Sequence, residues 1–503
     1  MDGGPVLNDY PFGRQVKRIV LVLPLCLVIV QLINFFHPFL PWHQWTPTAY
    51  SGQALWPEAG RPPALYYNDF KVLFETECSL DKLPRPRREV PRPRRVPLVG
   101  HDKSRDCEGI SGSFGDLSSK LDVYAVYWDT RHDNYLDYDV HLRIMTLTYD
   151  PSPDDNTEVF CVFNAETGSA NRHRVKARYG FGGRDYASAV QGGQILSCTV
   201  PPAIYGSNRQ RAPCTVRLAV FINIFKGAHL YSEGDFEILK TAPATQNRGF
   251  GVCVPPLYGD VPKTHIIEFI ELTELLGSRH VTFYDYALSS RARSVIQLYV
   301  KLKRATLLPW KIQKDVDEAL WRRSVKLAMA DCLYRNMATS VYVAFMDLNE
   351  YIMPYKWFTW HDMMLAMRSE KISGISVSGV FFDPFFQKES DGLLHDVERR
   401  ALTNRWRTVT SSRRQARAIV KPQAIFDTGA SGHEYLFASM PSKIKSVDYP
   451  DALAHQHQVC SVDADMNCVS MVRDDVVSQR YNDTLETFIT EMLQVFSKCE
   501  EDL

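Results

Sequence analysis

The sequence predicts an α/β protein. A mostly parallel, helix-covered sheet forms the C-terminal half, a β-sandwich-like module precedes it, and a transmembrane helix lies at the N-terminus. Three observations carry this prediction. The stretch 19–36 is almost wholly apolar, short turn-bounded apolar runs repeat between about 109 and 239, and strand-like and helix-like segments alternate from about 249 onwards. The chain has 503 residues, 45% of them hydrophobic, which is ample for more than one buried core.

The N-terminal segment predicts a signal anchor. The apolar run 19–36 resumes at 39–42 and is long enough to cross a bilayer, which takes about 20 residues. Arg14, Lys17 and Arg18 precede it, and since positive charge stays in the cytoplasm, we expect the bulk of the chain to lie in the lumen. No small-x-small cleavage site follows the run, so the pattern favours an uncleaved anchor over a cleaved signal peptide. The lipid bilayer is therefore one expected partner.

The predicted organisation has five parts. They are a cytoplasmic tail (1–18), the anchor (19–40), a stem rich in proline and arginine (41–106), a β-rich lumenal module (107–240) and an α/β domain (241–503). Lys plus Arg and Asp plus Glu both number 58, so the formal net charge is zero and nothing in it argues for a nucleic-acid partner.

The cysteines agree with a lumenal location. Cys26 lies in the predicted anchor, which leaves ten of the 11 cysteines, an even number that predicts disulfides in an oxidising compartment. None of them forms a CxxC pair, so a zinc site is not indicated. Cys332 lies in a helical pattern and is also explained as a buried thiol. The glycosylation sequon at 482–484 fits the same orientation.

The module is predicted from short apolar runs separated by turns, and it carries no evident catalytic constellation. Its expected strands are 121–128, 140–145, 158–163, 194–200 and 215–222. In the α/β domain, strands are expected at 251–255, 280–286, 341–354 and 372–382, with helices over 266–276, 295–300, 321–332 and 363–367. Ligands of such sheets collect at the carboxyl ends of the strands, where Asp285, Asp347 and Asp383 fall.

The run 341–354 gives the most specific chemical hypothesis. On one extended strand, Asp347 and Asn349 are two residues apart and point the same way, whereas Glu350 points to the opposite face. A carboxylate and an amide oxygen on one side can share a hard divalent cation. Enzymes that use a metal to hold a nucleotide diphosphate usually place two aspartates in this arrangement, and here the second is an asparagine.

Several motifs in this half resemble one known family. They are ADCLYR at 330–335, VAFMDLNEYIMP at 343–354, CVPPLYG at 253–259, Lys421-Pro422, and Gly432-His433-Glu434. Together they resemble glycosyltransferase family 92, formerly a domain of unknown function, over roughly 198–457. The resemblance implies a GT-A (Rossmann-like) fold in a type II, single-pass Golgi membrane protein with a lumenal catalytic domain.

The resemblance also implies an activity and a cofactor. The expected reaction transfers a hexose, galactose from UDP-galactose, with inversion to a β-linkage, onto a glycan acceptor of a glycoprotein or glycolipid. Manganese is the implied metal. Asp347 is expected to bind it, with Asn349 as a neutral second ligand and His433 completing the shell, a role for which His455 and His457 compete.

Four further residues receive roles from this resemblance and from general chemistry. Asp383 and Glu434 are the two candidates for the general base of an inverting transfer, and for each a turn or salt-bridge role is an equal alternative. Asp285 is expected to contact the uridine or ribose, by analogy with nucleotide-binding folds. Lys421 is expected to meet phosphate as a point charge, against the alternative of an ordinary solvated lysine.

Two departures from the family pattern motivate a second hypothesis. One is Asn349, and the other is His455-Gln456-His457, where the family tends to show His-Tyr-Arg. Both fall where charge control of the diphosphate is expected. The alternative is therefore a catalytically inactive, membrane-anchored lumenal glycan-binding or scaffold protein of the same fold. A lumenal hydrolase with paired carboxylates is a weaker third hypothesis, which predicts sugar release without a nucleotide donor.

Overall fold

A computed structural model describes thirteen stretches of the chain: residues 113–131, 139–149, 157–164, 172–179, 192–224, 227–240, 249–312, 318–368, 372–384, 400–427, 436–437, 443–460 and 468–500. The predicted tail, anchor and stem lie outside these described residues. No helix within the described stretches is both long enough and apolar enough to cross a membrane.

The first part of the described chain is a β-rich module. Its nine-stranded sheet has the order β5-β4-β8-β9-β2-β3-β7-β6, and β1 pairs with β2 off this path. The strands are β1 Gly115–Ser118, β2 Leu121–Asp129, β3 Val140–Thr148, β4 Thr157–Asn164, β5 Arg172–Lys176, β6 Arg178–Tyr179, β7 Gly192–Val200, β8 Thr215–Ile224 and β9 Gly227–Lys240, with a short helix α3 at Pro202–Tyr205. The five strands expected from the sequence coincide with β2, β3, β4, β7 and β8.

The module surrounds its own core, and a disulfide crosses it. Apolar side chains from β2, β3, β4, β7 and β8 form one buried cluster. Cys161 of β4 bonds to Cys198 of β7, which joins distant strands of the sheet. All residues of β2 and β3 are buried. Strand β2 divides its side chains between two clusters: Val123 and Val126 enter the module core, whereas Tyr124 and Tyr127 pack with residues of the second half of the chain.

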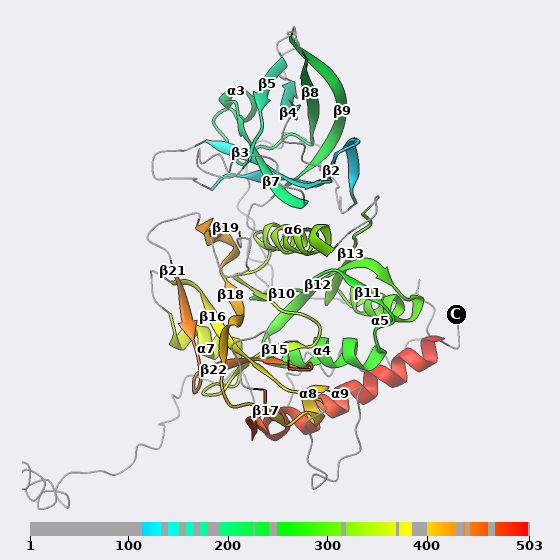
Figure 1. The fold of residues 1–503 in the computed structure, drawn as a ribbon, viewed down its shortest axis with the longest axis vertical. Coiled ribbons are helices and arrows are strands. Elements are labelled where there is room, and N and C mark those ends of the chain that lie inside the picture. Colours follow the sequence, from blue (N-terminus) through cyan, green and yellow to red (C-terminus); the bar gives the residue numbers. More distant parts are fainter. Residues whose placement is uncertain are drawn as a thin grey trace, which may run out of the picture. The chain divides into compact units, whose positions relative to one another are not determined.

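The second half is a mixed α/β domain built on a ten-stranded sheet, with the order β11-β12-β10-β14-β18-β16-β22-β15 (Figure 1). Strand β13 pairs with β12, and β21 with β16. Strands β18 and β15 run opposite to the others. The bounds are β10 Phe250–Cys253, β11 Leu257–Gly259, β12 Ser278–Leu288, β13 Ala305–Pro309, β14 Tyr342–Phe345, β15 Glu350–Pro354, β16 Ile372–Phe381, β18 Ser412–Val420, β21 Lys443–Val447 and β22 Ala452–Gln456.

Helices cover this sheet, as the alternating sequence pattern predicts. They are α4 Lys263–Leu276, α5 Ser290–Lys301, α6 Glu318–Asn336, α7 Trp360–Ala366, α8 Arg400–Thr403 and α9 Val476–Glu500, with a 3-10 turn η2 at Pro422–Ala424. Figure 1 shows α4 and α9 packed beside each other. Two small sheets complete the fold: β17 Trp406–Thr408 with β23 Met471–Arg473, and β19 Ile425–Asp427 with β20 Leu436–Phe437.

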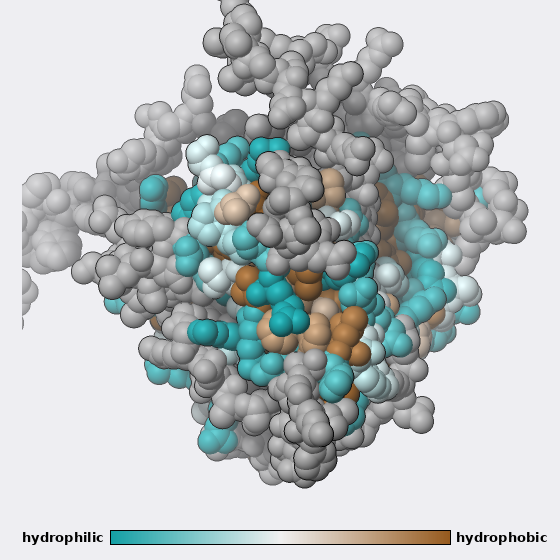
Figure 2. Space-filling view, turned by 90° about the horizontal axis from the view of Figure 1, so that it is seen from above, coloured by the Kyte–Doolittle hydropathy of each residue, from teal (hydrophilic) through white to brown (hydrophobic). Residues whose placement is uncertain are grey.

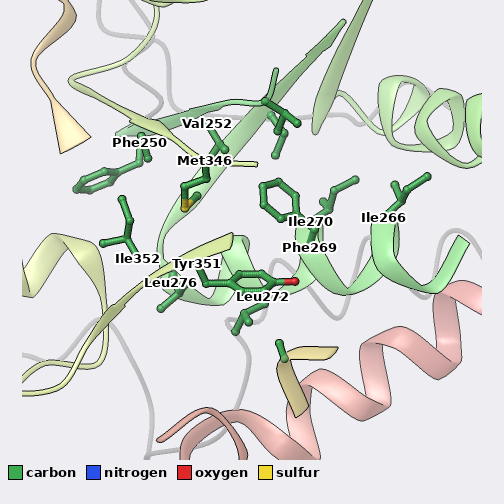
Figure 3. Packing of buried hydrophobic residues seen from close by; sticks show 14 of the residues in the cluster. Phe250, Val252, Ile266, Phe269, Ile270, Leu272, Leu276, Met346, Tyr351 and Ile352 are labelled. Atoms are coloured by element: carbon green, nitrogen blue, oxygen red, sulfur yellow. The ribbon is translucent and has the colours of Figure 1, made fainter. Parts of the chain in front are cut away.

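The surface is mixed in polarity. Among the residues that are not grey in Figure 2, small hydrophobic patches lie between hydrophilic ones. The large apolar side chains of the domain are instead buried between sheet and helices. Figure 3 shows Phe269 of α4 directed toward the side of β10 that carries Val252, and Leu272 below Tyr351; all of them belong to one buried cluster.

Two buried residues of this core hold the segment 347–350 from both sides. Met346 and Tyr351 are each only 2% exposed and belong to the same buried cluster (Figure 3). Burial of one such side chain contributes about 1.5–3 kcal/mol. Because the two residues flank the four-residue segment 347–350, packing holds both of its ends.

The prediction of one continuous strand over 341–354 is wrong. Strand β14 ends at Phe345, β15 begins at Glu350, and a turn joins them, in which the amide of Glu350 donates to the carbonyl oxygen of Asp347 at 3.0 Å. The two strands also pair in different places, β14 with β10 and β18, and β15 with β22. The alternation of an extended strand therefore does not describe how Asp347 and Asn349 are oriented.

The prediction of Cys332 as a buried thiol is also corrected. Cys332 of α6 forms a disulfide with Cys253, the last residue of β10. The carbonyl oxygen of Cys253 accepts from the amide of Met346 at 3.2 Å, directly before Asp347. A third disulfide joins Cys460 and Cys468, so pairing of cysteines is confirmed where the structure describes them.

Helix α6 carries a buried carboxylate that joins three elements. Asp331 is fully buried and accepts hydrogen bonds from Tyr127 of β2 at 2.6 Å, from Tyr284 of β12 at 2.7 Å and from Arg335 at 2.6 Å. A buried carboxylate requires such donors, because an unpaired one is strongly destabilising. The motif at 330–335 therefore serves packing and hydrogen bonding between the β-rich module and the α/β domain.

This arrangement predicts that Tyr127→Phe lowers the free energy of unfolding by about 1.5–3 kcal/mol, since it removes a donor to a buried charged group. Tyr231→Phe is the matched control, because its hydroxyl bonds to Ser119 at an exposed position and its loss should change stability by less than about 0.5 kcal/mol. Urea denaturation of both variants measures the difference. Equal effects would contradict the role given to Asp331.

Candidate functional site

The candidate site lies where several strands of the ten-stranded sheet end. Strands β14, β16 and β22 run in one direction, so their carboxyl ends meet at the same edge. Asp347 follows β14 by two residues, Asp383 follows β16 by two, and His457 follows β22 directly. Glu350 opens the antiparallel β15 and pairs with Gln456 at this edge. Ligands of such sheets bind beyond the carboxyl ends of the strands, so this edge is the natural candidate.

The turn that carries Asp347 is closed by two hydrogen bonds. The amide of Glu350 donates to the carbonyl oxygen of Asp347, and the amide of Asp347 donates to Oε2 of Glu350 at 2.9 Å. The two bonds hold the backbone of Asp347 through both its amide and its carbonyl group, while the carboxylate of Asp347 takes part in neither bond.

Glu350 is also one half of a bidentate ion pair. Both of its carboxylate oxygens accept from the guanidinium of Arg417, through Nε and Nη2. The side chain of Glu350 is 2% exposed and that of Arg417 is 24% exposed. Burial of the carboxylate makes the arginine necessary, because removal of one partner of a buried pair is strongly destabilising.

Arg417 reaches this edge from β18, the antiparallel strand between β14 and β16. The pairing of β18 with β16 is irregular between Val377 and Gly379, because Val377 pairs with Arg417 whereas Gly379 pairs with Ser412. A Cβ on Gly379 would lie 2.2 Å from the carbonyl oxygen of Gln415, so this close approach requires glycine. Nη1 of Arg417 donates to the carbonyl oxygen of Ala416 at 2.9 Å, which fixes the guanidinium further.

The electrostatics of the turn centre on Asp347. Burial raises the pKa of its carboxyl group to about 7, the negative charge of Glu350 adds to the rise, and the positive charge of Arg417 opposes it. Two carboxyl groups thus share one cationic side chain. The local charge favours a further positive group beside Asp347.

Asn349 links the turn to the end of β22. Its backbone oxygen accepts from the amide of His457 at 2.9 Å, and its Nδ2 donates to the carbonyl oxygen of His457 and to Oε1 of Gln458, both at 3.4 Å. An aspartate has no donor for these two acceptors. The asparagine therefore has a structural role in this turn.

The triplet 455–457 is fully buried. Phe382 lies against the rings of His455 and His457, with centroids 4.4 and 4.8 Å away. Burial lowers the pKa of His455 to about 4, so its ring is neutral near pH 7, and its Nε2 bonds to the hydroxyl of Tyr355 at 2.9 Å. Gln456 donates to the carbonyl oxygen of Gln415 at 2.8 Å. The triplet thus packs the edge together.

Two other predicted acids occupy this edge with their carboxylates engaged. Oδ2 of Asp383 accepts from the amide of Cys460 at 3.1 Å, which places it beside the Cys460–Cys468 disulfide. Asp285 ends up near the same edge on β12, but its Oδ1 accepts from the amide of Leu288 at 3.0 Å and its Oδ2 pairs with Arg293 at 2.6 Å. Asp285 is thus a turn and salt-bridge residue in this conformation.

The structure does not bring Lys421 to the Asp347 turn. Because β18 is antiparallel to β14, its end lies at the opposite edge, with Val420 paired to Val343. From this register Lys421 is roughly 16 Å from Asp347 along the strand direction. Its Nζ donates to the carbonyl oxygen of Ile372 at 3.1 Å.

Arg417, which the sequence analysis overlooked, is a cationic side chain at this edge. A signal existed in the sequence. Arg417 lies between Ala416 and Ala418 at the start of the apolar end of β18, and a charge in a central strand requires a counter-ion. Its position became clear only with the direction of β18, which the sequence pattern does not give.

His433 and Glu434 lie outside the described residues. Within the described stretches, no group of three or more His, Cys, Asp or Glu side chains is arranged to hold a metal ion. The turn does present oxygen donors, the carboxylate of Asp347 and the side-chain oxygen of Asn349, which are the ligand types that hard divalent cations take. On this set of donor types the residues fit a divalent cation.

Comparison with known proteins relates this region to sugar transfer. The model of glycosyltransferase family 92 matches residues 248–463. Beta-1,4-galactosyltransferase galt-1 of Caenorhabditis elegans is 23% identical over 186 residues, which cover 35% of this chain and 41% of that protein. The chain thus spans about two fifths of the length of this curated relative.

The solved structures that match this chain resemble it only weakly. The structure of S. aureus TarS 1-349 has 13% sequence identity and a TM-score of 0.22, and the match covers 42% of this chain and 60% of that one. A mycobacterial protein has 10% identity and the same TM-score of 0.22, covering 50% of this chain and 75% of that one. Scores this low carry no argument about the fold.

The pKa of Asp347 gives a pH-dependent prediction for metal-free protein. Its value in the folded state, about 7, lies above the usual 3.8, so the folded state holds the proton more tightly. The stability that Asp347 contributes is therefore fully present below about pH 4 and is lost as the pH rises through about 7. Asp347→Asn, which stays neutral, should exceed wild type in stability above pH 7 by roughly 1–2 kcal/mol and match it near pH 4.

Denaturation in EDTA across this pH range provides the measurement. Asp116→Asn is the control, because Asp116 is exposed and the same substitution there should leave the pH dependence unchanged. A stability difference between Asp347→Asn and wild type that does not vary with pH would contradict the environment assigned to Asp347.

Proposed function

We propose, from the match of residues 248–463 to glycosyltransferase family 92, that this protein is a glycosyltransferase that moves a hexose from a nucleotide sugar to a glycan acceptor. The observation that carries the proposal is the closed Asp347 turn, with the Glu350–Arg417 pair beside it, at the carboxyl edge of the sheet within the matched segment. The fold belongs to the GT-A type in this proposal.

The donor is UDP-galactose and the reaction inverts the anomeric centre to give a β-linkage. The name of the C. elegans relative, a beta-1,4-galactosyltransferase, supports this choice. Mn²⁺ is the cofactor, held by Asp347 and Asn349 together with His433. When bound, it neutralises the charge that develops on the leaving diphosphate.

The residues of the chain supply the remaining functions. Asp347 is held by its backbone in the closed turn, and its carboxylate takes part in neither of the two bonds that close the turn. Either Asp383 or Glu434 accepts the proton of the acceptor hydroxyl as the oxygen attacks the anomeric carbon and UDP leaves. Asp383 is the favoured candidate for this base because it lies at the same edge of the sheet as Asp347. Asp285, despite its pairing with Arg293, contacts the uridine or ribose.

The proposal also includes a location in the cell. The protein is a single-pass type II protein of the Golgi membrane, anchored by residues 19–40, and its folded part acts in the lumen on glycans of glycoproteins or glycolipids. The disulfides at Cys161–Cys198, Cys253–Cys332 and Cys460–Cys468 support an oxidising compartment.

One observation favours a second candidate function, a catalytically inactive glycan-binding or scaffold protein. The side chain of Asn349 is committed to β22 through two donated hydrogen bonds, where a second carboxylate would grip the metal more strongly. This candidate predicts binding of glycans without turnover of UDP-galactose.

Turnover of UDP-galactose distinguishes the glycosyltransferase from the inactive glycan-binding or scaffold protein. Full-length protein with Mn²⁺, UDP-galactose and a panel of glycan acceptors ending in fucose or galactose should release UDP, and Asp347→Asn should lower the rate by roughly 100-fold or more. Asp116→Asn is the matched control and should keep wild-type activity. A folded wild-type protein that releases no UDP with any acceptor would rule out the enzyme and favour the glycan-binding alternative.

The effect of the missing second acid is tested by Asn349→Asp. Adding a carboxylate should tighten Mn²⁺ binding by roughly tenfold, because one further unit charge faces the cation. Titration of free Mn²⁺ by electron paramagnetic resonance measures this without any turnover. Asn349→Ala serves as control, since it breaks the same two donated hydrogen bonds without adding charge. Equal Mn²⁺ affinity for Asn349→Asp and Asn349→Ala would show that position 349 does not face the metal.

A further inference from the structure

We propose that Arg417 binds the diphosphate of the nucleotide sugar, and that Glu350 is the counter-ion that holds the Arg417 guanidinium in place before the donor arrives. The inference rests on the proposed function and assigns a diphosphate contact within the same site. It concerns a residue that neither the family motifs nor the predicted site include.

The first argument is position. Arg417 comes from β18, whose neighbour Ala418 pairs with Phe345, two residues before Asp347. Arg417 therefore lies beside the turn between β14 and β15 that carries Asp347. Lys421, the lysine expected to meet phosphate, lies at the other edge of the sheet and donates to the carbonyl oxygen of Ile372.

The second argument is orientation. Glu350 holds the guanidinium through Nε and Nη2, and the carbonyl oxygen of Ala416 holds Nη1. A planar fork with few rotational choices loses little entropy when a ligand binds. With 24% of its side chain exposed, Arg417 is accessible from solvent, whereas the side chain of Glu350 is buried, with only 2% exposed. Arginine binds phosphate oxygens in the same bidentate geometry in which it binds carboxylates.

The third argument is charge. The carboxyl groups of Asp347 and Glu350 lie in one turn, and the guanidinium of Arg417 pairs with Glu350 beside them, so two acidic side chains stand next to this one basic side chain. An anionic diphosphate alone is therefore poorly accommodated at this edge, and a diphosphate accompanied by a divalent cation is well accommodated.

Isothermal titration calorimetry of the full chain with uridine, UMP and UDP, each with Mn²⁺, tests the assignment. Arg417→Gln should weaken UDP binding by at least tenfold and leave uridine binding within twofold of wild type, and Arg417→Lys should recover part of the loss. The double variant Arg417→Gln/Glu350→Gln removes both charges of the ion pair and leaves no unpaired buried carboxylate, so it keeps the fold where the single variant fails to fold.

The exposed Arg413 of the same strand gives the matched control, and Arg413→Gln should bind UDP as wild type does. If wild type binds UDP with Mn²⁺ but the double variant binds it equally well, the role of Arg417 is overturned and the proposed function stands. If wild type binds no UDP at all, the proposed function fails and the inference fails with it. A loss of uridine binding equal to the loss of UDP binding also overturns the inference, because it places Arg417 away from the phosphates.

Discussion

The ion pair between Glu350 and Arg417 is the interaction on which the rest of the site depends. Glu350 is buried, so it requires the arginine; Arg417 lies in a central strand, so it requires the carboxylate. The same carboxylate accepts from the amide of Asp347, and its negative charge adds to the rise that burial causes in the pKa of the Asp347 carboxyl group. One side chain thus holds the backbone of Asp347 and orients the neighbouring cation, and it contributes to the charge state of Asp347.

The scaffold explains why this pair has one geometry. Met346 and Tyr351 are buried on either side of the turn, and the Cys253–Cys332 disulfide joins the strand beside it to α6. Helix α6 in turn contributes Asp331, to which Tyr127 of the β-rich module donates. A continuous series of covalent and buried contacts therefore connects the module to the Asp347 turn, and the module is part of the structure that supports the site.

Periodicity in the sequence was sufficient to predict some of the regular elements. Five of the nine described strands of the module, helix α4 and strand β12 follow from alternating or helical spacing of apolar residues, because burial of one face determines that spacing. Strand β9 and helix α9 were not predicted. The same reasoning extended the strand at 341–354 too far, since the turn at Asp347 depends on hydrogen bonds of Glu350 that no spacing encodes. Lys421 was expected at the phosphate from the family resemblance and from general chemistry, and Arg417 was overlooked, because the direction of β18 comes from long-range pairing. Cys332 was ambiguous for a similar reason: its partner, Cys253, is 79 residues away.

One part of the candidate site thus comes from a single segment of the sequence, and the other part depends on pairing between strands that are distant in the sequence. Asp347 was identified from its own segment, whereas its neighbours Glu350, Arg417 and Gln456 act together only after β15, β18 and β22 have paired. The two departures from the family pattern gain a physical reading from this arrangement. Asn349 donates to β22, which an aspartate would not do, and the buried triplet 455–457 packs around Phe382.

The central claim is that the Asp347 edge binds a metal and a nucleotide diphosphate together. The most direct measurement is a crystal structure of the protein with UDP and Mn²⁺, with the metal located by its anomalous signal. The account predicts one anomalous peak within coordination distance of the Asp347 carboxylate, with the diphosphate between the metal and Arg417. A peak elsewhere, or UDP bound away from this edge, would contradict it.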